Sequence, residues 1–105
     1  MSRYLAVIRI GAGGSSHQWS DDPQTAARQC AKRARADWSR LYDIPKGHRF
    51  TVTVYDTETV PNDASVAWGA DSLIHWHEGD EAKSLAPFAV YSADERGTYN
   101  PDASQ

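Results

Sequence analysis

The sequence predicts an α+β domain in two layers, with one helix packed on a three- to four-stranded mixed or antiparallel sheet in the order strand, helix, strand, strand, strand. Three observations indicate this fold class. Residues 23–42 carry apolar side chains at helical spacing, residues 3–10 and 48–56 alternate with the period of a strand, and two short apolar runs follow. The 105 residues suit one domain, expected over residues 1–93, with a flexible tail over residues 94–105.

The first strand is expected at residues 3–10, where the sequence reads RYLAVIRI. Tyr4, Ala6 and Ile8 lie on one side of such a strand, because successive side chains point to opposite faces. Residues 11–22 are rich in glycine and serine. They lack the Lys-Ser/Thr pair and the third glycine of phosphate-binding loops, so we expect a flexible connector here.

The helix expected at residues 23–42 is the element around which the other segments pack. Asp22 can accept a backbone hydrogen bond at its N-terminus, and Pro23 suits the first helical position. Side chains spaced by three and four residues form one apolar stripe, expected to face the sheet: Ala27, Cys30, Ala31, Ala34, Trp38 and Leu41. Pro45 and Gly47 lie just beyond the end of this pattern and are expected to stop the helix.

Three strands are expected after the helix. The first, at residues 48–56, places Phe50, Val52 and Val54 on the side that the helix covers. Residues 72–77 and 86–93 form the others, with residues 79–84 as the hairpin loop between them. Residues 57–70 contain a turn around Pro61 and a short strand or anchored loop near Val66.

The net charge of −3 conceals an asymmetry along the chain. Residues 23–49 carry seven basic and two acidic side chains, whereas residues 50–105 carry two basic and ten acidic ones. One end of the fold should therefore be electropositive and the rest acidic, a distribution that steers binding partners.

The sequence predicts a cytoplasmic protein without a membrane segment. Its single cysteine, Cys30, falls on the apolar helix stripe and has no partner for an internal disulfide, which suits a reducing compartment. No apolar run approaches the roughly 20 residues that cross a bilayer.

The histidines at positions 75 and 77 are a candidate metal site. Two residues apart on a strand, His75 and His77 project to the same face, as paired imidazole ligands do. A tetrahedral site needs three or four ligands, and the sequence does not determine the others. The alternative is a pair of exposed histidines beside Trp76.

The basic face of the helix is a second candidate site. Arg28, Lys32 and Arg35 follow helical spacing and could contact the phosphates of a nucleic acid. The same side chains could dock on an acidic protein surface or could simply be solvated. The acidic remainder of the chain would repel a long polyanion.

Aromatic side chains exceed what one helix can cover. Tyr55, Trp68 and Trp76 fall on strands or loops outside the helix stripe. Either residues 57–72 fold over the second face of the sheet, or that face is where a partner or a second copy of the chain docks as a homodimer. Tyrosine, tryptophan and arginine are the residues that most often carry binding energy at interfaces.

The sequence favours a protein without catalytic activity. A thiol at Cys30 on the buried stripe would stay protonated and inert. Adjacent acidic residues fall in turns, where solvated carboxylates are normal, and no nucleophile motif is present.

In size and architecture, the strand at 3–10, the alanine- and arginine-rich helix, and the strand at 48–56 with the strand pair after it resemble small bacteriophage inhibitors, anti-CRISPR proteins among them. The resemblance spans residues 3–92. It implies a protein without catalytic activity that binds and blocks a host protein complex, its acidic second half mimicking a polyanion.

We therefore expect a protein-binding module that needs no cofactor and docks on a host protein or protein complex. Either the basic residues Arg28, Lys32 and Arg35 or the acidic loop of Glu78, Asp80 and Glu81 would steer docking, and Tyr55, Trp68 and Trp76 would anchor it. A metal-binding domain or metal-dependent enzyme using His75 and His77 is the first alternative, and a nucleic-acid binder is the second.

Overall fold

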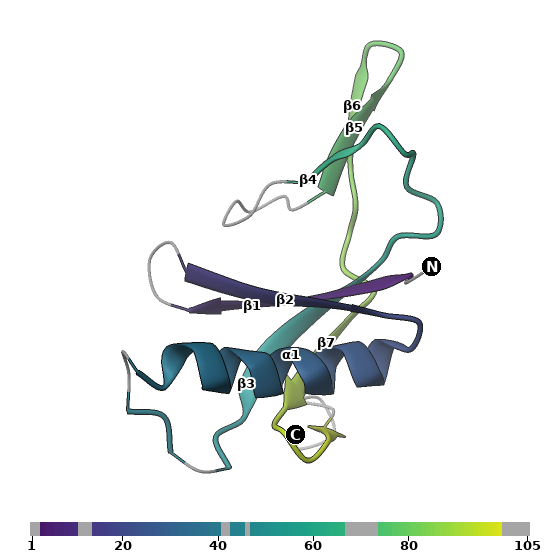
Figure 1. Ribbon diagram of the computed structural model, residues 1–105. Coiled ribbons are helices and arrows are strands. Elements are labelled where there is room, and N and C mark those ends of the chain that lie inside the picture. The colour runs from purple at the N-terminus through teal and green to yellow at the C-terminus, as the bar shows by residue number, and fades with distance from the viewer. Residues whose placement is uncertain (1–2, 11–13, 41–42, 46, 67–73, 100–105) are drawn as a thin grey trace.

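In the described part of the computed structural model, five strands form an antiparallel sheet and one helix covers one of its faces (Figure 1). The structure describes residues 3–10, 14–40, 43–45, 47–66 and 74–99. The α+β class and an antiparallel main sheet are confirmed. The strand number and order differ from the prediction, because the chain contains additional strands before and after the helix.

The order of strands in the main sheet is β2-β1-β3-β7-β8. The strands are β1 (Tyr4–Ile10), β2 (Gly14–Ser20), β3 (Phe50–Asp56), β7 (Ala89–Ala93) and β8 (Thr98–Tyr99). Every neighbouring pair is antiparallel, with Leu5 opposite both Trp19 and Tyr55. These three side chains therefore lie in one row across the sheet, on the face away from the helix.

The helix α1 spans Pro23–Trp38 and begins as its sequence indicates. The Asp22 carboxylate accepts the backbone N–H of Thr25 at 2.8 Å. This hydrogen bond holds the pKa of the Asp22 carboxyl below its usual range. The cap satisfies one of the N–H groups that a helix N-terminus leaves without a partner.

Small side chains let α1 lie close against the sheet. Its buried residues are Ala26, Ala27, Cys30, Ala31 and Ala34. They share one core with Ala6, Ile8, Phe50, Val52, Val54 and Ala93, as the two alternating strand patterns predict. Burial of this face supplies most of the stability of such a helix, because isolated helices of this length are marginal in water.

The helix ends earlier than expected, at Trp38 rather than residue 42. Ser39 caps it: its N–H donates to the Arg35 carbonyl at 3.0 Å, and its hydroxyl donates to the Ala36 carbonyl at 3.3 Å. The Trp38 indole N–H donates to Ser16 Oγ at 3.1 Å, so this ring joins the helix end to β2. Pro45 and Gly47 lie beyond the end, and Gly47 has the positive φ of 82° that glycine adopts readily.

The expectation of a flexible connector over residues 11–22 is wrong for Gly14–Ser20. This segment is β2, an edge strand that is in register with β1 along its whole length. Ser16 is buried, and its carbonyl accepts the Cys30 thiol at 3.4 Å. Contacts with β1 and α1 therefore form this strand despite its glycine- and serine-rich sequence.

The expected C-terminal tail also begins too early, because residues 94–99 form a turn and β8. The buried Asp94 carboxylate accepts the N–H groups of Arg96 at 2.8 Å and Gly97 at 3.0 Å. These bonds, the Arg96 N–H first, lower the pKa of the Asp94 carboxyl from its ordinary value of 3.8. The Asp94 side chain thus stabilises the turn that leads from β7 into β8.

Replacing Asp94 by asparagine should reduce the loss of stability in acid. A carboxyl group whose pKa is lowered by folding contributes stability above its unfolded pKa, and this contribution is lost as the pH falls through the folded pKa. Urea unfolding at pH 7 and pH 3 measures the effect, with the exposed Asp63→Asn as control. Equal acid sensitivity in Asp94→Asn and the wild type would contradict this role of Asp94.

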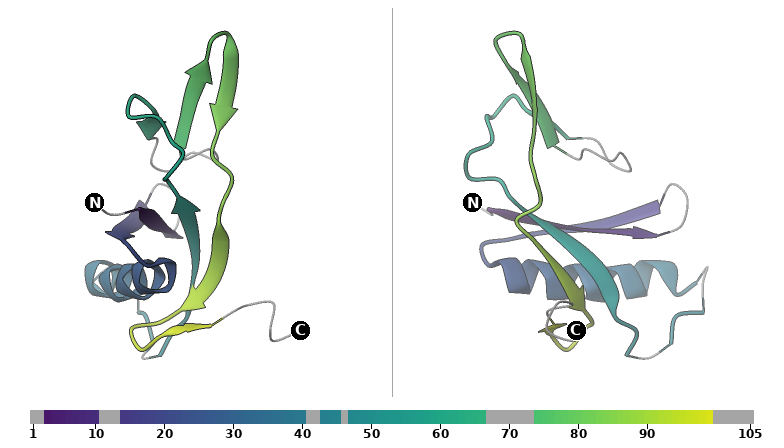
Figure 2. Two further views of the ribbon diagram at one scale, coloured as in Figure 1. Left: turned by 90° about the vertical axis from the view of Figure 1, so that its right-hand side faces the viewer. Right: turned by 180° about the vertical axis from the view of Figure 1, so that it is seen from behind.

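A second, three-stranded sheet lies on the side of the main sheet away from the helix (Figure 2). Its strands are β4 (Ser65–Val66), β5 (Ile74–Glu78) and β6 (Glu81–Ser84), in that order. The segment expected to be only a hairpin loop, residues 79–84, is therefore a two-residue turn followed by a strand. The β5–β6 hairpin projects away from the helix and the main sheet (Figures 1 and 2).

The base of the second sheet closes a second core. The buried residues of this core are Leu5, Val7 and Tyr55 from the main sheet and Ile74 from β5. The partly buried side chains of Val60, Ala64, Trp76 and Leu85 pack around them. The sequence left two alternatives for the second face of the sheet: cover by the chain itself, or contact with a partner. At Leu5, Val7 and Tyr55, the chain covers its own sheet. The proposed homodimer contact through this face cannot use Leu5, Val7 or Tyr55, because these side chains are already buried.

Candidate protein-binding surface

Carboxylates dominate the part of the structure formed by residues 56–66 and 74–85, which we call the acidic arm. Its described acidic side chains are Asp56, Glu58, Asp63, Glu78, Asp80 and Glu81. Lys83 is the only basic side chain within the arm's described residues. Arg3, which directly precedes β1, contacts Asp56 of the arm. The arm is therefore a surface of net negative charge next to the main sheet.

Both basic groups at the arm are held by carboxylates. The Arg3 guanidinium donates to both oxygens of Asp56 at 2.8 and 2.7 Å, and lies 2.8 Å from Glu58 Oε2. The hydrogen bond with Asp56 raises the pKa of Arg3, and it lowers the pKa of the Asp56 carboxyl. Lys83 Nζ lies 3.9 Å from Glu78 and 3.5 Å from Glu81.

The turn at the end of the hairpin presents the acidic residues together. Glu78 pairs with Glu81 across the turn, which leaves Gly79 and Asp80 as the two loop residues. Gly79 has a φ of 62°, and no residue other than glycine has a positive φ among those described. A positive φ at the first loop position alone matches a type II′ hairpin turn, which favours glycine there. The local sequence thus determines the turn that carries the predicted acidic loop.

The predicted aromatic anchors differ in accessibility. Tyr55 is only 7% exposed within the second core, so its ring is not available as a surface anchor. Trp76 is half-buried on β5 beside that core, and its indole N–H is buried without a hydrogen-bond partner among the described residues. A hydrogen bond from this N–H to an acceptor would stabilise the protein, because a buried donor without a partner costs free energy. Trp68 lies outside the described residues.

The predicted histidine pair is exposed on β5. His75 lies opposite Ser84 and Ser65, and His77 lies opposite Ala82. Within the described part of the chain, no group of three or more histidine, cysteine, aspartate or glutamate side chains has an arrangement that could hold a metal ion. The described residues therefore supply no third ligand for the site expected at this pair.

The basic helix residues do not form one uniform patch. Arg35 forms an ion pair with Glu95 at 2.6 Å, which the sequence pattern did not reveal. Arg28 is half-buried beside Asp22 and Arg96 near the start of the helix, and Lys32 is exposed. Arg33 and Asp37 also form an ion pair along the helix at 3.4 Å, but both side chains are exposed, so this pair contributes little to stability.

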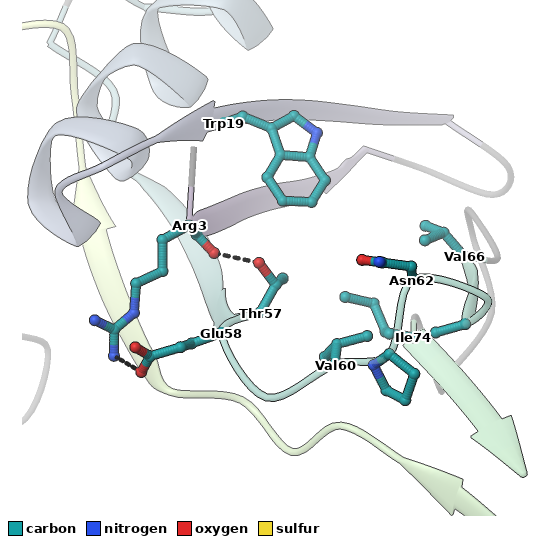
Figure 3. A pocket seen from close by; sticks show the side chains of 10 residues that line it. Arg3, Trp19, Thr57, Glu58, Val60, Asn62, Val66 and Ile74 are labelled. Atoms are coloured by element: carbon teal, nitrogen blue, oxygen red, sulfur yellow. Dashed lines mark hydrogen bonds and ion pairs between the residues drawn. The ribbon is translucent and has the colours of Figure 1, made fainter. Parts of the chain in front are cut away.

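A groove of about 420 Å³ lies between the main sheet and the acidic arm (Figure 3). Its lining residues are Arg3, Trp19, Thr57, Glu58, Val60, Pro61, Asn62, Ala64, Val66 and Ile74. No pattern in the sequence indicates this groove. The only available signal was Trp19, a large side chain in an otherwise small and polar segment.

Comparisons with protein-family models, curated proteins and solved structures find no match to this chain. Within the described residues, no helix is both long and apolar enough to cross a membrane.

Proposed function

We propose that this chain is a non-enzymatic protein-binding module that docks its acidic arm on a basic surface of a partner protein. The observation that carries the proposal is the charge of the arm. The arm's described residues carry six carboxylates, whereas the basic groups at the arm are Lys83, paired with Glu78 and Glu81, and Arg3, paired with Asp56 and Glu58. A surface of this kind attracts a basic partner and increases the rate of association.

The exposure of the β5–β6 hairpin supports a role in contact. Ile74 is its one buried residue, and the side chains from His77 to Ala82 are all exposed. Hairpins with so little cover are marginally stable on their own. The edge strand β6 carries Glu81 and Lys83, and charged side chains at an edge discourage pairing with further strands. Side chains of the hairpin, rather than strand addition, are therefore proposed to contact the partner.

A module of this kind can act as an inhibitor. Basic surfaces of proteins commonly bind the phosphates of nucleic acids. An acidic arm that covers such a surface prevents nucleic acid from reaching it. We accordingly propose that the partner is a host protein or complex with a nucleic-acid-binding surface, the role implied by the resemblance to small phage inhibitors.

Reversing the charge of the hairpin tip should slow association with the partner by at least about tenfold at low salt, because exposed interface charges act mainly on the association rate. The variant combines Glu78→Lys, Asp80→Lys and Glu81→Lys, all at exposed positions. The partner is first captured with the wild-type chain and purified, and association rates are then measured across a salt series.

The matched control combines Arg28→Glu and Lys32→Glu on α1. This variant should retain the wild-type association rate within about threefold, because its charges lie on the helix rather than on the arm. An association rate that falls in the helix variant and not in the arm variant would refute docking through the arm.

A further inference from the structure

The groove at the base of the acidic arm presents the face of an exposed tryptophan. Trp19 projects from β2 into the groove, opposite Val60 and Ile74 (Figure 3). Trp19 is 39% exposed, although tryptophan is highly buried on average. Val60 and Val66 provide accessible apolar surface in the lining, whereas Ile74 is 1% exposed.

The rim of the groove has surplus negative charge. Among the described residues that line the groove, Arg3 is the one basic side chain, and it is shared between Asp56 and Glu58. The Glu58 side chain is 63% exposed, and Asp63 is exposed next to the lining residue Asn62. An anionic ligand would be repelled here, and a neutral apolar one would leave the surplus charge without a counterpart.

We propose that this groove holds an arginine side chain of the basic partner, with the guanidinium stacked on the Trp19 ring, the aliphatic stem against Val60, and the rim carboxylates of Glu58 and Asp63 supplying the negative charge. A guanidinium is planar and weakly hydrated, and it stacks on tryptophan more readily than the ammonium of lysine does. The aliphatic stem of arginine also buries well on apolar surface.

This inference rests on the proposed function, because it takes the arginine from the partner that the acidic arm binds. The geometry links the two sites. The groove is lined by Val66 of β4 and Ile74 of β5, and the acidic turn lies at the other end of the β5–β6 hairpin. One basic surface that lies along the hairpin can therefore place a side chain in the groove.

A titration of ¹⁵N-labelled protein with N-acetyl-L-arginine methylamide tests the inference. N-acetyl-L-norleucine methylamide, which has an aliphatic stem without the charge, is the matched control. The arginine compound should shift the Trp19 indole N–H signal with saturation, at least fivefold more tightly than the control compound. The signal is assigned with Trp19→Phe.

Substitutions in the groove provide the second arm of the test. Trp19→Leu keeps an apolar side chain on β2 but removes the aromatic ring, and it should weaken arginine binding roughly tenfold. Glu58→Gln should weaken it less, and only at low salt. Saturable shifts that are equal for the two compounds, or that lie away from the groove, would overturn the inference, as would the absence of saturation.

The arm variant Glu78→Lys, Asp80→Lys, Glu81→Lys separates this inference from the proposed function. It should lose fast association with the partner and retain arginine binding in the groove. If partner association is unchanged while the groove still binds arginine, docking through the arm is wrong. If the arm variant slows association and the groove binds no arginine, only the present inference is wrong.

Discussion

Replacing Ile74 by alanine should lower the free energy of unfolding by roughly 2–5 kcal/mol, the usual cost of truncating a buried isoleucine. Ile74 is 1% exposed, and it is the residue of β5 that is buried with Leu5, Val7 and Tyr55 of the main sheet. The truncation removes apolar contacts and leaves a cavity between the two sheets. The acidic arm should therefore loosen along with the overall loss of stability.

Urea unfolding followed by tryptophan fluorescence measures the loss, and amide hydrogen exchange reports whether the arm opens first. Val66→Ala is the control, because Val66 lies in the neighbouring strand β4 but is 42% exposed. Its effect should stay within about 0.5 kcal/mol. If Ile74→Ala costs less than about 1 kcal/mol, Ile74 does not hold the arm to the main sheet.

Cys30 should react with iodoacetamide roughly a thousandfold more slowly in the native protein than in the unfolded chain at pH 8. Burial raises the pKa of the Cys30 thiol from 9.0 to about 12, and the thiolate is the reactive form. Three pKa units correspond to about a thousandfold fewer thiolates at this pH. The thiol also donates to the carbonyls of Ala6 at 3.5 Å and Ser16 at 3.4 Å.

The same shift makes the fold sensitive to alkali. A group whose pKa is raised by folding contributes stability that is complete below its unfolded pKa and is lost as the pH rises toward its folded pKa. For Cys30 this window runs from 9.0 to about 12. Alkylation rates at several pH values, with and without denaturant, provide the measurement; rapid labelling of the native protein would show that the thiol is accessible.

The helix and the central strands could be predicted because local and tertiary preferences agree there. Asp22 caps α1, alanines at spacings of three and four face the sheet, and Phe50, Val52 and Val54 alternate beneath them. Each of these features follows from the period of its element. The apolar pattern did not indicate the early end of the helix, where Ser39 donates hydrogen bonds to the carbonyls of Arg35 and Ala36.

Two strands of the main sheet, β2 and β8, escaped prediction for different reasons. β2 is mostly glycine, serine and other polar residues, and its pairing with β1 and contact with α1 stabilise it. β8 contains two residues and depends on the turn that Asp94 stabilises. Tertiary contacts therefore override the local preference of β2, whereas the residues of β8 favour a strand but are too few to give an alternating pattern.

The acidic loop could be predicted from charge, whereas the groove could not. Glu78, Asp80 and Glu81 are close in sequence, so their shared location follows from one hairpin turn. Trp19 and Val60 are far apart in sequence and meet only because residues 57–66 return over the main sheet. Likewise, the ion pair of Arg35 with Glu95 could not be predicted, because the two residues are far apart in sequence. This pair leaves Arg35 less able to contact a partner.

Site-specific photo-crosslinking tests most directly whether the acidic arm docks on a basic partner. A benzophenone amino acid is placed at His77 on the arm or at Lys32 on the helix, both exposed, and each protein is irradiated with the purified partner. We predict a crosslinked product from position 77, attached to the partner within a segment rich in lysine and arginine. Efficient crosslinking from position 32 and none from position 77 would contradict the proposed docking surface.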